Sequence, residues 1–120
     1  MAALLLKRIY DSPATSDGYR ILIDRLWPRG IKKENAQIDL WLKDIAPSNA
    51  LRTAFHHEPQ NWEHFKQAYY EELEHNIEAQ SVLRKALQEH KRVCLLYAAK
   101  DPHYNNAQVL KLFLEKKKWL

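Results

Sequence analysis

An aspartate, two arginines and a tryptophan follow a short apolar run in the first quarter of the chain. The run is Ile21-Leu22-Ile23, and it is followed by Asp24-Arg25-Leu26-Trp27-Pro28-Arg29-Gly30. Pro28 restricts its own backbone and that of the preceding residue, so the charges are predicted to lie on a stiff loop. Arg25 and Arg29 could hold a phosphate or carboxylate, and Asp24 could orient a guanidinium or accept a proton. The alternative is that Asp24 and Arg25 only join the loop to its neighbours and that Trp27 belongs to the core.

A second polar group follows the clearest strand-like segment, residues 92–98. It contains Tyr97, Lys100, Asp101 and the opening of the next predicted helix, Tyr104-Asn105-Asn106. A helix N-terminus offers free N–H groups and a positive dipole end, so this turn is predicted to favour an anion, with Lys100 adding positive charge. The alternative is that Asp101 or an asparagine only caps the helix and that Lys100 is solvated. Neither of the two glycines falls here, so the turn has no P-loop or Rossmann fingerprint.

The histidines and the single cysteine give weaker signals. His56 and His57 are adjacent and His64 follows, but no pair stands four residues apart in one evident helix, so no metal site is predicted. His57, beside the turn at Pro59, is a candidate hydrogen-bond donor or proton carrier facing the site. Cys94 lies inside the strand-like segment and is most simply a small core residue.

Composition narrows the class of protein. The chain has 120 residues, which favours one domain over residues 1–120, and a net charge of +4, which favours anionic partners without choosing among them. One cysteine rules out an intrachain disulfide and favours a reducing, cytoplasmic location. The apolar start is short and is predicted to be a strand and not a signal peptide, and no apolar run is long enough to cross a membrane. No cofactor motif is present.

Hydrophobic periodicity predicts the elements that must position these groups. We expect strands near residues 4–9, 21–23 and 92–98, the first of them buried on both faces. Helices are expected near residues 32–45, 49–56, 62–73, 77–90 and 105–117, with Ser48 and Asn61 as N-caps and with Ile77 and Val82 turned inward. This order predicts a small three-layer α/β domain, with a short, largely parallel sheet of about three strands and helices on both faces. The loops after Asp24 and Ala98 are then expected to meet at one edge of the sheet.

Several stretches together resemble one bacterial family. They are Asp17-Gly18-Tyr19-Arg20, residues 24–30, Trp41-Leu42-Lys43-Asp44-Ile45-Ala46-Pro47-Ser48, His57-Glu58-Pro59 with Trp62 and Phe65, and Leu95-Leu96-Tyr97-Ala98-Ala99-Lys100-Asp101. In this order they closely resemble the YeaO-like branch of the domain-of-unknown-function family 488. The resemblance covers nearly the whole chain and implies a small cytoplasmic α/β domain without an established activity.

The chain also departs from the pattern of that family. Related branches are similar in having a cysteine where this chain has Tyr97, and a Cys-His-Arg run where it has Asn105-Asn106-Ala107. The YeaO-like branch usually has histidines at the places held here by Tyr104 and Asn106. The resemblance therefore does not carry thiol or histidine–metal chemistry to this chain. What it leaves as candidates is Asp24, Arg25, Arg29, Lys100, Asp101 and Asn105.

Two hypotheses follow. In the first, a pocket between the two loops recognises a nucleotide-like or phosphorylated small anion and could catalyse a reaction on it. Asp24, Lys100 and Asp101 are then the candidate catalytic residues, and Arg25, Trp27, Arg29, His57, Tyr97 and Asn105 the candidate ligand-binding residues. In the second, the protein is a regulatory module that binds nucleic acid or a protein partner. A nucleic-acid surface would need one continuous basic face, whereas a protein-binding surface would expose an apolar patch that could include Trp119 and Leu120.

Overall fold

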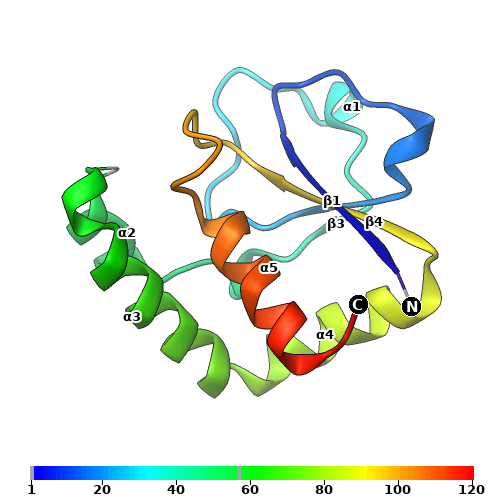
Figure 1. Cartoon of the computed structure of the whole chain (residues 1–120). Helices are drawn as coiled ribbons and strands as arrows, with labels where there is room; N and C mark the ends of the chain where they lie inside the picture. Colours follow the sequence, from blue (N-terminus) through cyan, green and yellow to red (C-terminus); the bar gives the residue numbers. More distant parts are fainter. Residues whose placement is uncertain (1, 57) are drawn as a thin grey trace.

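A computed structural model describes residues 2–56 and 58–120, and in this part of the chain four parallel strands form one sheet (Figure 1). The strands are β1 (Ala3–Arg8), β2 (Tyr19–Leu22), β3 (Leu40–Trp41) and β4 (Arg92–Tyr97), in the spatial order β1-β4-β2-β3. In register, Ala3 pairs with Arg92 and Tyr19 with Val93. The last of these strands in sequence is therefore central, and it has a continuous run of buried side chains, as expected for a parallel strand covered on both faces.

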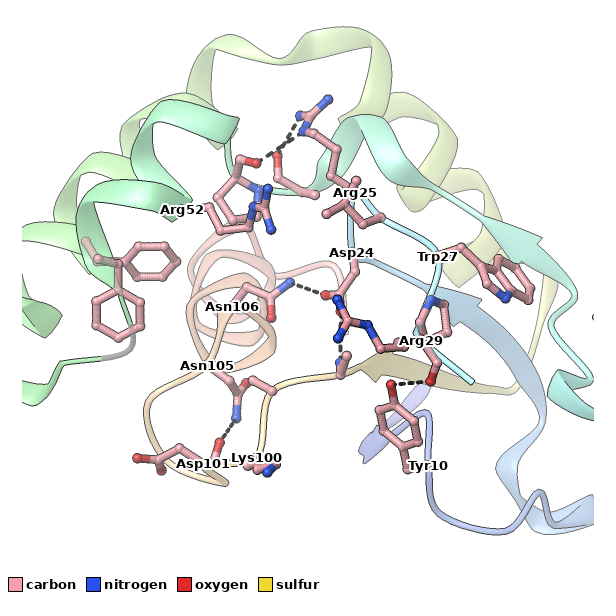
Figure 2. A pocket seen from close by; sticks show the side chains of 18 residues that line it. Tyr10, Asp24, Arg25, Trp27, Arg29, Arg52, Lys100, Asp101, Asn105 and Asn106 are labelled. Carbon is pink, nitrogen blue, oxygen red and sulfur yellow. Dashed lines mark hydrogen bonds between the residues drawn. The ribbon is translucent and has the colours of Figure 1, made fainter. Parts of the chain in front are cut away.

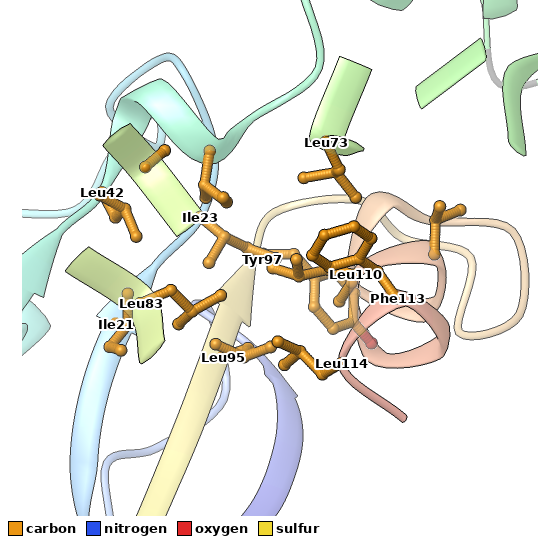
Figure 3. Close-up of a cluster of buried hydrophobic side chains, with 14 of the residues drawn as sticks. Ile21, Ile23, Leu42, Leu73, Leu83, Leu95, Tyr97, Leu110, Phe113 and Leu114 are labelled. Atoms are coloured by element: carbon orange, nitrogen blue, oxygen red, sulfur yellow. The ribbon is translucent and has the colours of Figure 1, made fainter. Parts of the chain in front are cut away.

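The helices divide unequally between the two faces of the sheet. The larger core packs α2 (Asn49–Phe55), α3 (Trp62–His75), α4 (Ile77–Glu89) and α5 (Asn106–Lys117) against one face, where Ile21, Leu95 and Tyr97 meet Leu83, Leu110 and Phe113 (Figure 3). The second face carries a smaller core of Ile9, Leu22, Ala36, Cys94 and Leu96, covered by the short α1 (Lys33–Ala36) and by loops. The predicted three-layer α/β class is confirmed, with one thin layer.

Residues 33–45 differ most from the prediction. One helix was expected there, but the structure has the single turn of α1, then β3, then a 3₁₀ turn at Lys43–Ile45. Gln37 adopts a left-handed conformation with a φ of +49° and ends α1, after which Leu40 pairs with Ile21 of β2. The helix expected somewhere in residues 32–45 is thus limited to the single turn of α1, and the sheet has a fourth strand because the following segment pairs with β2.

Three other expectations need correction. β1 lies at the edge of the sheet, so Leu5 is 44% exposed and this strand is not buried on both faces. Ile77 and Val82 point outward, 66% and 44% exposed, because Leu83 and Leu87 define the inner face of α4. Asn61 does not cap α3 and instead donates from Nδ2 to the Phe55 carbonyl oxygen at 3.2 Å. The predicted cap Ser48 is confirmed, since its Oγ accepts from the Leu51 N–H at 3.2 Å.

A buried ion pair fixes the start of β2. The Arg20 guanidinium is paired with Asp17, and the Arg20 and Asp17 side chains are only 5% and 1% exposed. Arg20 also donates to the carbonyl oxygens of Gln37 and Ala36, at 2.9 and 3.0 Å, which holds the end of α1 against the sheet. Lys7 of β1 completes the cluster at 3.1 Å from Asp17. One carboxylate therefore connects β1, β2 and the α1 segment.

Gly18 and Gly30 allow a matched test of how closely the chain at Gly18 approaches β4. Both have positive φ, +75° at Gly18 and +81° at Gly30, but a Cβ at Gly18 would lie 2.3 Å from the Arg92 carbonyl oxygen, whereas nothing lies within 4 Å at Gly30. We expect Gly30→Ala to lower the free energy of unfolding by about 1 kcal/mol, through backbone strain alone. Gly18→Ala adds a clash with the backbone of β4 and should cost about 2–3 kcal/mol. Urea unfolding measures both, and equal losses would contradict the close approach at Gly18.

The described part of the chain has no helix that is both long enough and apolar enough to span a lipid bilayer.

Candidate functional site

A cavity of about 600 Å³ opens at the carboxyl ends of β2 and β4. Its walls come from the loop after β2, the loop between β4 and α5, and the side of α2 (Figure 2). The expected meeting of the two loops is therefore confirmed. Parallel α/β sheets commonly bind ligands at this edge, since loops from neighbouring strands converge there. Among the predicted site residues, the structure brings Asp24, Arg25, Trp27, Arg29, Lys100, Asp101 and Asn105 to the cavity.

Asp24 joins the two loops. Its Oδ2 accepts from the Ala98 N–H at 2.8 Å, and its Oδ1 accepts from Asn106 Nδ2 at 2.9 Å (Figure 2). The Asp24 carbonyl oxygen in turn accepts from Trp41 Nε1 at 2.7 Å. The carboxylate thus binds the end of β4 and the first residue of α5. This geometry gives Asp24 a structural role, and its predicted catalytic role stays a prediction.

Arg25 and Arg29 differ in what their guanidinium groups contact. Arg25 donates to the carbonyl oxygens of Pro47 and Ala46, at 3.3 and 3.2 Å, and so connects the β2 loop to the segment before α2. The Arg29 guanidinium has no hydrogen-bonding or ionic partner in the part of the chain that the structure describes. Figure 2 shows Arg29 among the residues that surround the cavity, near Tyr10. Of the two guanidinium groups, only that of Arg25 is therefore engaged by the described residues.

The backbone at Arg29 is held by a contact that the sequence did not suggest. The Tyr10 hydroxyl donates to the Arg29 carbonyl oxygen at 2.9 Å, and the Arg8 guanidinium lies over the Tyr10 ring, 4.9 Å from its centroid. Arg8 also donates to the carbonyl oxygens of Ala98 and Ala99, each at 3.0 Å. The end of β1 thus fixes both loops on the side of the cavity opposite α2.

The turn after β4 is built by its own polar side chains. Asp101 Oδ1 accepts from the N–H groups of His103 and Tyr104, at 2.8 and 3.1 Å. Asn105 is the N-cap of α5: its Oδ1 accepts from the Gln108 N–H at 3.2 Å, and its Nδ2 donates to the Asp101 carbonyl oxygen at 2.9 Å. The capping alternative is therefore confirmed for Asn105. Lys100 is exposed, and no described residue forms a hydrogen bond or ion pair with its ammonium group.

Three other predicted residues have different surroundings. Trp27 lines the cavity, donates from Nε1 to the Ile31 carbonyl oxygen at 2.7 Å and packs edge-on against Trp41. Tyr97 lies in the larger core and is not among the residues that line the cavity, and burial raises the pKa of its hydroxyl. Cys94 is fully buried, and burial raises the pKa of its thiol to about 11, as expected for a core residue and not a nucleophile. His57 lies outside the described residues.

The structure adds Arg52 and Tyr10 to the lining, and it also places Asn106 there, at the start of α5. Arg52 stands three residues before the buried Phe55 on α2, so the two share a helix face. This spacing in the sequence could have indicated Arg52 as a site residue. The role of Asn106 depends on a contact 82 positions away in sequence, which no local pattern indicates. Over residues 2–56 and 58–120, no three His, Cys, Asp or Glu side chains group as a metal site would require.

Comparison with known proteins assigns this chain to a family. Residues 3–118 match the family model described as the inactive DUF488-N3 subclade. The chain is 47% identical to the uncharacterized protein YeaO of Escherichia coli K12 over 105 residues, which cover 87% of this chain and 90% of that protein. It is 44% identical to the uncharacterized protein Rv3073c of Mycobacterium tuberculosis H37Rv over 78 residues, 65% of each chain. No solved structure gives a significant match. This chain therefore belongs to the DUF488 family, as a relative of YeaO within the subclade described as inactive.

Proposed function

We propose that this protein binds a small anionic ligand in the cavity between the β2 and β4 loops, without catalysing a reaction on it. The observation that carries the proposal is the imbalance of charge in the lining. Four cationic side chains, Arg25, Arg29, Arg52 and Lys100, face the cavity together with two carboxylates. Both carboxylates, Asp24 and Asp101, already accept hydrogen bonds from the protein. Cations whose charge is not matched nearby favour an anion from solution.

Arg29 and Lys100 are the groups that would contact the anion directly. They extend from different loops, and neither side chain has a protein partner among the described residues. A guanidinium can give a carboxylate or phosphate two parallel hydrogen bonds, while an ammonium adds a mobile charge. The N-terminal end of α5 also lies at the cavity and carries a positive partial charge. Arg25 would act indirectly by holding the loop that carries Arg29.

Binding without catalysis agrees with the state of the reactive groups. Asp24 joins the two loops and Asp101 supports the turn before α5, so hydrogen bonds from the protein already engage both carboxylates that line the cavity. The thiol of Cys94 is buried in the core and its pKa is raised. The description of the matched subclade as inactive also favours binding without catalysis.

The arrangement of the other basic residues favours a small ligand over nucleic acid. Lys116, Lys117 and Lys118 stand at the C-terminal end of α5, whereas the cavity lies at its N-terminal end (Figure 1). Lys117 pairs there with Glu74 at 3.2 Å. The two groups of cations therefore do not form the continuous basic face that a nucleic-acid surface requires. Trp119 and Leu120 pack against the larger core, which weakens the case for an apolar docking patch there.

Arg29→Ala tests the proposal. We expect a small phosphate or carboxylate compound, from a panel that also contains short oligonucleotides, to raise the melting temperature of the native protein. A compound at 100 times its dissociation constant adds roughly 2.7 kcal/mol of stability. Arg29→Ala should weaken its binding about 10- to 100-fold, since hydrogen bonds to charged groups contribute about 1.5–3 kcal/mol. Differential scanning fluorimetry finds the compound, and calorimetric titration gives the dissociation constants.

Arg92→Ala is the matched control, because Arg92 is also an exposed arginine but lies at the opposite end of β4. It should leave binding unchanged. The salt dependence of binding should be shallow, as for a single small anion, and a steep dependence seen only with oligonucleotides would contradict the proposal. So would equal binding by native protein and a folded Arg29→Ala variant.

A further inference from the structure

The cavity has a second kind of wall, which indicates what else the ligand carries besides its charge. Leu26, Pro28, Pro47, Phe55 and Phe65 line it together with the cations; we call these five residues the apolar wall. Phe55 and Phe65 are only 4% and 3% exposed and stack on one another with ring centroids 4.6 Å apart, so they form a fixed surface. Leu26, in contrast, is 57% exposed although it lies beside Arg25 in the loop. Within the cavity lining, Leu26 therefore leaves apolar area that a ligand could cover.

The volume of the cavity also favours a ligand that is larger than a simple anion. Its volume of about 600 Å³ is within the range of roughly 300–1,000 Å³ typical of sites for drug-sized ligands. An inorganic oxyanion held between Arg29 and Lys100 would leave the exposed part of the apolar wall, chiefly Leu26, in contact with water. A ligand that also covers this wall would release that water, and each buried methylene group should tighten binding about fourfold.

Resting on the function proposed above, we infer that the ligand is amphipathic: one carboxylate or phosphomonoester group held by Arg29 and Lys100, and an apolar or aromatic body lying on the apolar wall. Inorganic phosphate alone and polyphosphates lack the body. Neutral aromatic compounds lack the group that the cations hold.

A series of probes with one anionic group and a growing body tests this inference. Inorganic phosphate, phenyl phosphate and 1-naphthyl phosphate form one arm, acetate, benzoate and 1-naphthoate the second, and phenol and 1-naphthol the neutral arm. Dissociation constants are measured by calorimetric titration at one pH and ionic strength. We expect affinity to rise at least tenfold from the smallest to the largest probe in one or both charged arms, and the neutral arm to bind at least tenfold more weakly than its charged counterparts. The tighter charged arm identifies the anionic group.

Two variants separate the wall from the charge. Leu26→Ser should reduce the gain from the aromatic body by several-fold while leaving affinity for the smallest charged probe unchanged. Arg29→Ala should weaken all the charged probes about equally. Leu26 is largely exposed, so the variant should keep the fold, and an unchanged urea unfolding curve checks this.

The two proposals fail in different ways. If charged probes bind in an Arg29-dependent manner but gain nothing from the body, the amphipathic ligand is wrong and the anion site stands. If the gain from the body is present but Leu26→Ser leaves it unchanged, the placement of the body on the apolar wall is wrong. If no probe binds in an Arg29-dependent manner, the anion site fails and the inference fails with it.

Discussion

Replacing Asp17 with asparagine should lower the free energy of unfolding by about 3–5 kcal/mol, because the change leaves the charge of a buried guanidinium without its partner. The Arg20 side chain is 5% exposed, and Asp17 is the only carboxylate in contact with it in the described part of the chain. Asp17 also accepts from the Ala14 N–H at 3.0 Å and pairs with Lys7. Urea unfolding of the native protein and of Asp17→Asn measures the loss.

The same carboxylate should give the protein an acid-sensitive component of stability. Burial opposes ionisation of Asp17 most strongly, but hydrogen bonds from the Ala14 N–H, Lys7 and Arg20 outweigh it and hold the pKa of the carboxyl below its ordinary value of 3.8. A carboxyl with a lowered pKa in the folded state contributes stability that is present above pH 3.8 and is lost as the pH falls through the folded pKa. Asp17→Asn should therefore show a smaller loss of stability with acid than the native protein does.

Glu74→Gln is the control for both measurements. It removes a carboxylate paired with Lys117 at 3.2 Å, but these side chains are 40% and 34% exposed, so the cost should be under about 1 kcal/mol. Equal losses in the two variants, or an acid profile that Asp17→Asn leaves unchanged, would contradict the role assigned to the buried pair.

Asp24→Ala is the second large effect, with an expected loss of about 3–5 kcal/mol. The substitution removes two acceptors of hydrogen bonds to a charged group, each worth about 1.5–3 kcal/mol, and leaves the Ala98 N–H without its acceptor. Because these bonds join the β2 loop to the β4 loop, hydrogen exchange should quicken first at the Ala98 N–H. Exchange monitored by NMR shows where the loss is localised.

Asn106→Ala separates the two bonds of this bridge. It removes only the Asn106 donor, so it should cost less than Asp24→Ala and leave the Ala98 N–H protected. A catalytic or ligand-binding Asp24 with no structural role would give a different result: Asp24→Ala would bind and react differently while unfolding at the same urea concentration as the native protein. Stability thus distinguishes the bridge from the predicted catalytic role.

Sequence patterns predicted those elements whose burial is set by their own residues. β4 was readable because a central parallel strand is buried on both faces and is therefore continuously apolar. α5 was readable because Val109, Leu110, Phe113 and Leu114 repeat with helical spacing, and all four are buried. The two-residue β3 and the exposed Leu5 were not readable, since both depend on strand order, which no local pattern specifies.

The candidate site was likewise predicted in part and missed in part. The two loops were predicted to meet because the ends of parallel strands share one edge of the sheet, and they do meet. Residue types alone could not show that Arg25 contacts backbone carbonyl oxygens while Arg29 does not, because that difference depends on how the segment before α2 lies against the loop. Arg8 was missed for a similar reason: it acts on Ala98 and Ala99, some 90 positions away in sequence.

The position of β4 in the sheet also constrains how the chain acquires its structure during synthesis. β4 pairs with both β1 and β2, and β1 and β2 do not pair with each other. A nascent chain that has emerged only as far as α4 can pair β2 with β3, but β1 has no partner and one edge of β2 stays open until residues 92–97 leave the ribosome. Pairings this distant in sequence close late and slowly. Until then the partial chain exposes apolar strands, and this is the interval in which aggregation or chaperone capture competes with folding.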